Sequence, residues 1–260
     1  MKTVMLTFDI EECDFFTSDD KFTISKQGTE TILNILDKRK IKGTFFVTSA
    51  FALKYKKLIS DIYKSGHEIA SHGHTHEHDY GDMTGNAAYN YIINSKKIIE
   101  KIINAKIFGF RAPRLHPPNY NILKSIGFEY DSSYHPTYVP GRYNNFLGNR
   151  NIHDIDGVKI VPISVTPYVR LPLSWFWFRN IGLNYAKYCT TSIFKKGGFL
   201  NIYFHPWDFV DMSKADCGGM IKRNTGSIMI DMFSRYIDWL SGIGVKFDTI
   251  KNYIGDNNGL

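Results

Sequence analysis

The regular alternation of short apolar segments with longer amphipathic segments is the strongest constraint on the fold. The short segments are rich in β-branched and aromatic residues: Thr3–Asp9, Gly43–Thr48, His67–His72, Ile107–Arg111, Phe128–Ser132, Val158–Val165, Phe199–His205 and Val245–Thr249. The clearest helical spacing between them occurs in Ile24–Lys38, Ala87–Ile103 and Ser227–Leu240. Such alternation predicts a mostly parallel sheet with helical crossovers. Seven or eight units in one chain favour a (β/α) barrel over an open sheet.

Residues 134–180 interrupt this alternation. They hold five of the nine prolines, a predicted hairpin across Asp156–Gly157 and the aromatic segment Leu171–Arg179, which reads LPLSWFWFR. We interpret this stretch as a long insertion in a βα loop, so that residues 1–260 form one domain with an insertion. The chain is 43% hydrophobic and 22% charged, which excludes disordered, collagen-like and disulfide-scaffold proteins.

The cysteines and the N-terminal segment predict a cytoplasmic protein. Cys13, Cys189 and Cys217 are scattered without paired spacing, as expected of reduced thiols. The first predicted strand begins at Thr3 with no signal-peptide pattern before it, and no apolar run is long enough to span a membrane. The net charge is +7, with basic residues spread along the chain. This spread argues against nucleic-acid binding and leaves open an anionic substrate or membrane face.

Polar residues of the kinds that ligate metals or transfer protons gather where the predicted strands end. They are Asp9, Glu11 and Glu12 after the first strand, His72, His74, His76 and His78 after the third, Arg111 and Arg114 after the fourth, Asp131 after the fifth and His205 after the seventh. The carboxyl ends of barrel strands share one face, where active sites of such barrels lie. We therefore expect these side chains to form one site.

The histidine cluster predicts a metal site. His72 and His76 are four residues apart, so on a helical turn both rings would share a face and could bind one metal. His74 and His78 have the same spacing, so spacing alone does not choose between the pairs. A solvated polar loop is the alternative interpretation.

A carboxylate would complete a catalytic zinc site, and Asp9 or Glu11 could supply it. In an extended segment these two residues point to the same side. One of them could therefore bind the metal while the other faces the bound water.

Five motifs occur in a fixed order along the chain. They are TFDIEE (Thr7–Glu12), GHEIASHGHTH (Gly66–His76), FRAP (Phe110–Pro113), GFEYDSS (Gly127–Ser133) and YFHPWD (Tyr203–Asp208). Together they resemble the NodB-homology polysaccharide deacetylases, carbohydrate esterase family 4. The branch found in surface-polysaccharide gene clusters is the most similar, because its signature ends in His-Pro-Trp-acidic. The resemblance spans roughly residues 3–250 and implies a distorted (β/α)7 barrel that removes an N-acyl group from an amino sugar with the help of a metal.

The resemblance also implies roles for individual residues. Asp9 matches the general base, Arg111 the arginine that holds this base in place, and His205 the general acid. An ionised Asp9 can accept the proton of the attacking water, and a protonated His205 can donate one to the departing amine.

Glu11, His72 and His76 match the metal ligands of the family, which resolves the ambiguity with His74 and His78. The commoner first motif has two adjacent acids, whereas Ile10 stands in the second position here, so the metal role passes to Glu11. Two histidines and a carboxylate suit zinc, although cobalt, nickel or iron would also fit.

Four further residues are predicted to support the site or line the substrate. Asp131 matches such a residue in the family, Trp207 is expected in the core or the pocket wall, and Asp208 is a candidate to orient His205. Arg114 stands where many relatives have a tyrosine whose backbone N–H stabilises the oxyanion. A cation at this position suggests an anionic group on the substrate.

The segment Leu171–Arg179 has two interpretations. It is too short to span a bilayer but suits the membrane interface, where it could contact the inner membrane face or a lipid-linked substrate. Ordinary core packing is the alternative.

The expected activity is removal of an N-acetyl or N-formyl group from an amino sugar of a surface polysaccharide or its lipid-linked precursor. A metal-dependent phosphoester hydrolase is one competing hypothesis, which needs further metal-binding histidines. His116, His135 and His153 show no evident ligand pattern for that role. A non-catalytic carbohydrate-binding relative is the other.

Overall fold

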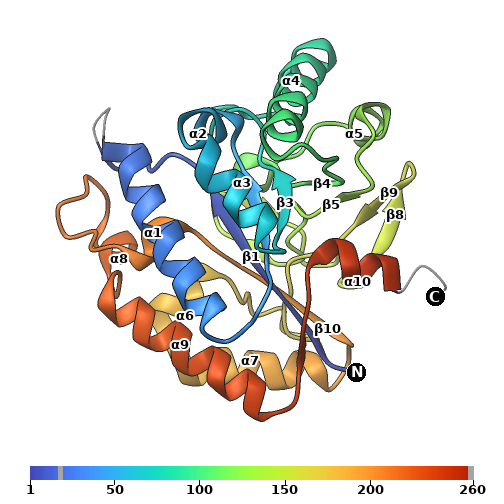
Figure 1. Ribbon diagram of the computed structural model, residues 1–260. Helices are drawn as coiled ribbons and strands as arrows, with labels where there is room; N and C mark the ends of the chain where they lie inside the picture. Colours follow the sequence, from blue (N-terminus) through green and yellow to red (C-terminus); the bar gives the residue numbers. More distant parts are fainter. Residues whose placement is uncertain (17–19, 257–260) are drawn as a thin grey trace.

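A computed structural model describes residues 1–16 and 20–256 (Figure 1). The strands are β1 (Thr3–Ile10), β2 (Thr44–Val47), β3 (Glu68–Ser71), β4 (Gly109–Phe110), β5 (Tyr130–Asp131), β6 (Tyr138–Val139), β7 (Tyr143–Asn144), β8 (His153–Ile155), β9 (Val158–Ile160), β10 (Phe199–Phe204) and β11 (Lys246–Phe247). The α-helices are α1 (Asp20–Asp37), α2 (Ser49–Lys54), α3 (Lys56–Lys64), α4 (Gly85–Ile103), α5 (Tyr120–Ile126), α6 (Trp175–Ile181), α7 (Leu183–Phe194), α8 (Gly219–Lys222), α9 (Ser227–Gly242) and α10 (Ile250–Asp256). Two 3₁₀ turns, η1 (Pro113–Leu115) and η2 (Pro206–Phe209), follow β4 and β10.

The main sheet curls into a distorted barrel. Its strand order is β10-β1-β2-β3-β4-β5-β9-β8, and every neighbouring pair from β10 to β9 is parallel. Within the described residues this gives seven parallel strands in a row, with the antiparallel β8 at the edge and β11 paired to β1. Figure 1 shows β1 near the centre of the molecule with helices around it. The predicted distorted (β/α)7 barrel is confirmed.

The two faces of β1 explain why the strand is buried along its whole length. Val4, Leu6 and Phe8 pack into the large core beneath the helices, and each such side chain contributes about 1.5–3 kcal/mol by leaving water. The alternate residues point into the barrel, where Met5 belongs to a smaller apolar cluster and Asp9 lies near the carboxyl end. Asp9 therefore lies at the carboxyl end of β1, where the apolar interior of the barrel ends.

Asn201 joins the two ends of the curled sheet. The backbone N–H of Ser164 donates to the Asn201 carbonyl at 2.9 Å, and the Asn201 side chain donates to the Pro162 carbonyl at 3.1 Å. The strand predicted over Val158–Val165 is wrong in its second half, because β9 ends at Ile160. Pro162 has no backbone N–H to donate to a neighbouring strand. The side chain of Asn201 therefore makes hydrogen bonds where the two ends of the sheet meet.

The interrupted stretch of residues 134–180 contains two hairpins. One joins β8 and β9 across Asp156 and Gly157, as predicted, and their φ values of 54° and 81° are those of a type I′ turn. The other joins β6 and β7. Within the described residues, the longest apolar helices are too short or too polar to cross a bilayer.

A glycine allows α1 to approach the 3₁₀ turn that follows β10. A Cβ atom at Gly28 would lie only 1.8 Å from the backbone oxygen of Pro206. No side chain fits in that space, so glycine is required for this helix to pack against η2. The contact places α1 directly behind the segment that begins at His205.

Candidate active site

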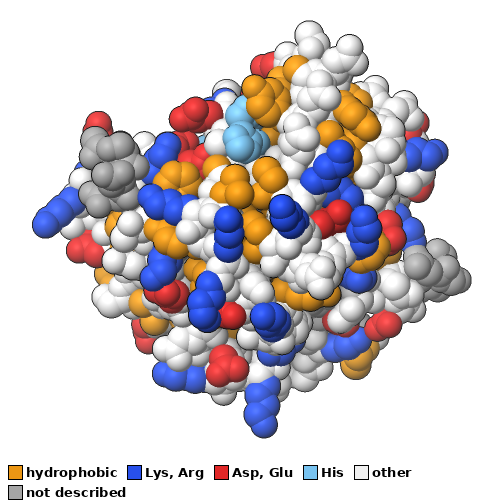
Figure 2. All heavy atoms as spheres, turned by 45° about the horizontal axis from the view of Figure 1, so that its top comes forward, with side chains coloured by type: hydrophobic (Ala, Val, Ile, Leu, Met, Phe, Trp, Pro, Cys, Tyr) orange, Lys and Arg blue, Asp and Glu red, His pale blue; other side chains and the backbone are white. Residues whose placement is uncertain are grey.

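Side chains at or just beyond the carboxyl ends of β1, β3, β4 and β10 meet in one hollow of about 360 Å³. Asp9, Glu11, His72, His76 and His205 all line it. Figure 2 shows histidine, acidic and hydrophobic side chains meeting on the face brought forward from the top of Figure 1. The structure thus brings these strand-end residues together.

Asp9 is held by a fully buried arginine. Nη1 of Arg111 donates to Asp9 Oδ1 at 2.7 Å and to Thr7 Oγ1 at 2.9 Å. Its other nitrogens donate to the backbone and hydroxyl oxygens of Ser132, at 2.9 and 2.8 Å, and the guanidinium lies over the Phe46 ring at 4.1 Å. A buried charge is tolerated only when it is paired and hydrogen-bonded, and every nitrogen of this guanidinium has a partner. Asp9 is therefore fixed in place and opposite a permanent positive charge.

Glu11 is a buried carboxylate surrounded by three imidazoles. Its Oε2 lies 2.9 Å from His72 Nε2 and 3.8 Å from His76 Nε2, and its Oε1 lies 3.6 Å from His205 Nε2. Burial raises the pKa of Glu11, but the neighbouring histidines outweigh it and hold the pKa at about 2. The group therefore carries its negative charge at neutral pH.

The two predicted metal-binding histidines are oriented by their other ring atoms. Nδ1 of His72 donates to the backbone oxygen of Arg111 at 2.7 Å, which leaves Nε2 directed at Glu11. Nδ1 of His76 lies 3.0 Å from Asp14 Oδ2, and the backbone N–H of His76 donates to Glu12 Oε1 at 2.9 Å. The attraction of Glu11 raises the pKa of His76 to about 9. The helical turn expected here is wrong, because residues 72–75 have no helical backbone and the two rings converge from a loop.

The other pair of histidines points elsewhere. Nδ1 of His74 lies 2.8 Å from the hydroxyl of Ser49, and Nδ1 of His78 lies 2.6 Å from that of Thr75. Both rings pack against Tyr91. They form a cluster of their own beside α4 and do not line the hollow.

Aromatic rings enclose His205. Its ring stacks on that of Trp207, with the ring centroids 4.8 Å apart. The rings of His205 and Trp175 form a T-shaped pair, with centroids 5.0 Å apart. Burial lowers the pKa of His205, while Glu11 and Asp208 oppose this effect. Its Nδ1 is buried without a hydrogen-bond partner among the described residues and lies 3.9 Å from Asp208 Oδ2. Trp207 is thus part of the pocket wall, as its position in the sequence suggested.

Asp208 and Arg179 form a buried ion pair behind His205. Arg179 Nε lies 3.0 Å from Asp208 Oδ1, and both side chains are fully buried. Asp208 Oδ2 accepts the backbone N–H of His205 at 2.9 Å, so the pair is tied to the histidine through its main chain. Burial raises the pKa of Asp208, and Arg179 opposes this. Sequence reasoning missed Arg179, whose only signal was a lone cation at the end of an aromatic segment.

The segment Leu171–Arg179 supplies several of these groups. Leu173, Trp175 and Phe178 are buried in the core, whereas Phe176 and Trp177 are partly exposed. Core packing therefore accounts for much of its apolar character. Only the partly exposed rings of Phe176 and Trp177 are left to support the membrane-interface interpretation.

Asp131 does not line the hollow. Its carboxylate accepts the backbone N–H of Ser133 at 2.9 Å and the Ser133 hydroxyl at 2.6 Å. That hydroxyl in turn accepts the backbone N–H of Ala112 at 2.8 Å. Burial raises the pKa of Asp131 to about 6. Asp131 thus orders the chain beside Arg111.

Two arginines stand at the rim of the hollow. Arg114 lies in η1 with a φ of 57°, and the following Leu115 has a φ of 60°. Non-glycine residues rarely adopt such values, which cluster at functional sites. Arg142, from the β6–β7 turn, also lines the hollow and forms no ion pair within the described residues. Sequence reasoning missed Arg142 because nothing local places that turn near β4.

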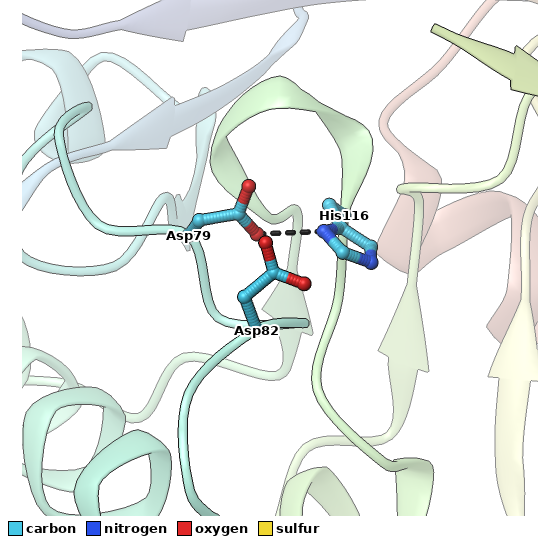
Figure 3. A group of neighbouring side chains, drawn as sticks. All are labelled: Asp79, Asp82 and His116. Carbon is cyan, nitrogen blue, oxygen red and sulfur yellow. Dashed lines mark hydrogen bonds and ion pairs between the residues drawn. The ribbon is translucent and has the colours of Figure 1, made fainter.

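A second group of ligand-type side chains lies outside this hollow (Figure 3). The donor atoms of Asp79, Asp82 and His116 lie within 4.8 Å of one another, and His116 Nδ1 is 2.7 Å from Asp79 Oδ1. The sequence showed no evident ligand pattern for His116, since its two neighbours in this group are distant from it along the chain. The group is largely exposed, and Arg114 approaches Asp79 to 3.9 Å. A cation this close competes with any bound metal ion.

Comparison with known proteins gives a consistent result. The family described as Polysaccharide deacetylase matches residues 1–130, a span that includes Asp9, Glu11, His72, His76 and Arg111. A search of curated proteins finds no match.

Solved structures share the fold. A protein described as a polysaccharide deacetylase from Mycobacterium smegmatis is 18% identical, with a TM-score of 0.71 over 98% of this chain and 88% of the other. The peptidoglycan deacetylase PdaC from Bacillus subtilis is 16% identical, with a TM-score of 0.56 over 96% and 89%. A pseudoenzyme of carbohydrate esterase family 4 from Bacillus anthracis is 15% identical, with a TM-score of 0.55 over 96% and 64%.

Proposed function

This chain belongs to the polysaccharide deacetylase family, and we propose that it is a metal-dependent amide hydrolase. In this proposal it removes an N-acetyl or N-formyl group from an amino sugar of a surface polysaccharide or of its lipid-linked precursor. One observation carries the proposal: two carboxylates in different settings line the same hollow. Asp9 is held by an arginine, and Glu11 is surrounded by three imidazoles. The His-Pro-Trp-Asp motif at His205 supports the surface-polysaccharide branch.

The residues present fit a zinc ion. Glu11, His72 and His76 supply the carboxylate and two imidazoles of a common catalytic zinc site, and His72 already has its Nδ1 engaged by a backbone oxygen. When bound, zinc would polarise the amide carbonyl and make water a stronger acid. Cobalt, nickel or iron would suit the same donors.

Asp9 acts as the general base. It accepts the proton of the attacking water, and its ion pair with Arg111 prevents the carboxylate from turning away. Because Arg111 is itself held by Thr7 and Ser132, the base is aligned before substrate arrives.

His205 acts as the general acid. Its Nε2 faces the hollow near Glu11 and donates a proton to the departing amine, while Trp207 and Trp175 fix the ring plane. Asp208 lies on the Nδ1 side and opposes the lowering of the pKa of His205 by burial, while Arg179 opposes the rise that burial causes in the pKa of Asp208.

The rim of the hollow selects the substrate. The backbone N–H of Arg114 helps to stabilise the oxyanion that forms as the amide is attacked. The guanidinium groups of Arg114 and Arg142 bind an anionic group of the substrate at the mouth. We place the reaction in the cytoplasm, with Phe176 and Trp177 as the candidate contact to the inner membrane face.

The test is proton NMR of the acid released when zinc-loaded protein meets an envelope glycolipid extract. Wild type is expected to release acetate or formate, and Asp9→Asn is expected to release neither. Inorganic phosphate in place of a carboxylic acid, detected by phosphorus NMR of the same sample, would favour phosphoester hydrolysis. A wild-type protein that binds zinc but releases nothing from this extract or from N-acetylated oligosaccharides would be a carbohydrate-binding relative, and the proposal would fail.

A further inference from the structure

A second hollow, of about 310 Å³, lies in the interrupted stretch of the chain. We call it the cationic hollow and define it by Phe146, Leu147, Arg150, Tyr168, Arg170 and Lys196. None of its lining residues lines the candidate active site. It brings together the loop after β7, the loop before α6 and the residues that follow α7.

The charges in the cationic hollow have no counterpart. It is lined by three cations and by no carboxylate, and none of the three forms an ion pair within the described residues. Some other arginines of the molecule do have such partners, as Arg39 has in Asp238. A guanidinium nitrogen of Arg170, Nη1, is buried with no hydrogen-bond partner there. Buried polar groups are normally satisfied, so this nitrogen is available to donate a hydrogen bond to an acceptor that enters the hollow.

The same arginine is held in an unfavourable electrostatic setting. Burial and the nearby charge of Arg150 both lower the pKa of Arg170. An anion between the two guanidinium groups would relieve their repulsion and supply the acceptor that Nη1 lacks.

The backbone holds this arrangement before any ligand binds. Tyr168 and Arg170 have φ values of 63° and 56°, which non-glycine residues rarely adopt. Thr137 Oγ1 donates to the Arg170 carbonyl at 2.7 Å, and the Leu171 N–H donates to Thr166 Oγ1 at 2.9 Å. The loop therefore presents Arg170 from a fixed position.

Apolar side chains stand beside the charges. Leu147 is 93% exposed and Tyr168 is 77% exposed, and both line the cationic hollow. Exposed apolar groups next to a cluster of cations suit a ligand with an anionic head and an apolar body. Three cations exceed what one carboxylate can neutralise, whereas a phosphate monoester or a diphosphate offers about two or more charges and several acceptor oxygens.

We propose that the cationic hollow binds the phosphate or diphosphate group of an amphiphilic molecule. The group could belong to a single lipid-linked phosphate or to the headgroup of a bilayer phospholipid, and the two sources share this chemistry. The inference does not depend on the reaction proposed above.

Calorimetric titration with hexyl phosphate and with inorganic phosphate tests the site. Wild type is expected to bind both, with hexyl phosphate the tighter ligand because of Leu147 and Tyr168. Arg150→Gln/Arg170→Gln should weaken both by at least about tenfold, since each lost charge removes a charge-assisted hydrogen bond. Lys97→Gln/Lys101→Gln removes the same charge from the exposed face of α4 and should bind like wild type.

Equal binding by the two double variants would overturn the proposal, as would a wild type that binds neither ligand at millimolar concentration. Hexyl and inorganic phosphate of equal affinity would overturn its amphiphilic part. If the arginine double variant does not fold, Lys196→Gln, at an exposed position, should still weaken binding several-fold.

Vesicle sedimentation distinguishes the two sources. Binding to vesicles that contain phosphatidic acid, whose headgroup is a phosphate monoester, would assign the site to bilayer headgroups if it is lost in Arg150→Gln/Arg170→Gln. Binding of hexyl phosphate without vesicle binding would assign it to a single lipid-linked phosphate.

Discussion

Glu11 and Glu68 are both buried carboxylates, and they lie at opposite ends of the same barrel. Glu68, at the amino end of β3, accepts hydrogen bonds from the Tyr130 hydroxyl at 2.8 Å, the Thr44 hydroxyl at 2.8 Å and the backbone N–H of Lys251 at 3.0 Å. Glu11, at the carboxyl end of β1, faces imidazoles whose nitrogens converge on it from three directions.

The difference lies in what surrounds each group. Glu68 is held by fixed, neutral donors, and burial raises its pKa. Glu11 is held by bases, and its pKa falls to about 2. The first arrangement caps α10 and joins it to the sheet, whereas the second keeps a charge where a cation can bind. Barrel enzymes generally place stability at one end and chemistry at the other.

The largest effect is expected from removing a proton-transfer group at the carboxyl end. Asp9→Asn or His205→Ala should lower turnover by about two to four orders of magnitude while zinc content stays at the wild-type level. Steady-state rates of amide hydrolysis and zinc analysis by mass spectrometry measure both. Near-normal turnover in either variant would rule out the assigned role, and Glu68→Gln at the far end serves as the active control.

Glu11→Gln should lose the metal while the fold is kept. Removing a ligand weakens zinc binding by at least about a hundredfold, and dialysis against a chelator should strip this variant first. Zinc content after dialysis and near-UV circular dichroism report the two properties. A Glu11→Gln protein that retains zinc as wild type does would exclude Glu11 as a ligand.

Glu68→Ala should show the opposite pattern. It leaves the Tyr130 hydroxyl and the Lys251 N–H without acceptors, so the free energy of unfolding should fall by about 2–4 kcal/mol. Urea denaturation measures this loss. Activity per folded molecule should match wild type, and a selective loss of activity would show that the two ends are not independent.

The smallest effect concerns pH at the amino end. The backbone N–H of Gly43 donates to His67 Nδ1 at 3.1 Å, so the ring must be neutral, and burial holds its pKa at about 4. The unfolded chain takes up this proton near pH 6.5, so stability should fall as pH drops from about 6.5 to 4, by up to about 3 kcal/mol.

His67→Asn can still accept the Gly43 N–H but does not titrate. The free energy of unfolding, measured by urea denaturation, should therefore change less across this pH range in the variant than in wild type. Identical pH profiles would show that His67 contributes nothing to acid lability.

Long-range periodicity made much of the barrel predictable. Strands such as β1 and β10 are continuous apolar runs because both of their faces are buried, and the polar residue at each carboxyl end marked the site. The six-residue helix α2 carries too few turns for a periodic signal and was not predicted.

Contacts between distant loops could not be predicted. Arg179 meets Asp208 only because α6 folds back over β10, and His116 meets Asp79 only through two loop paths. Spacing alone left His74 and His78 as an equal alternative, and the family resemblance predicted that His72 and His76 converge, but the expected helical backbone was wrong. Local spacing constrains neighbouring residues, whereas loop paths depend on tertiary packing.

The contact between Gly28 and Pro206 means that alignment of the proposed acid can be disturbed from outside the cavity. Any larger residue at this point of α1 would push on the carbonyl next to His205. A displacement of about 1 Å in a catalytic group can cost a hundredfold in rate. A substitution such as Gly28→Ala should therefore cost turnover together with stability, although this residue touches neither metal nor sugar.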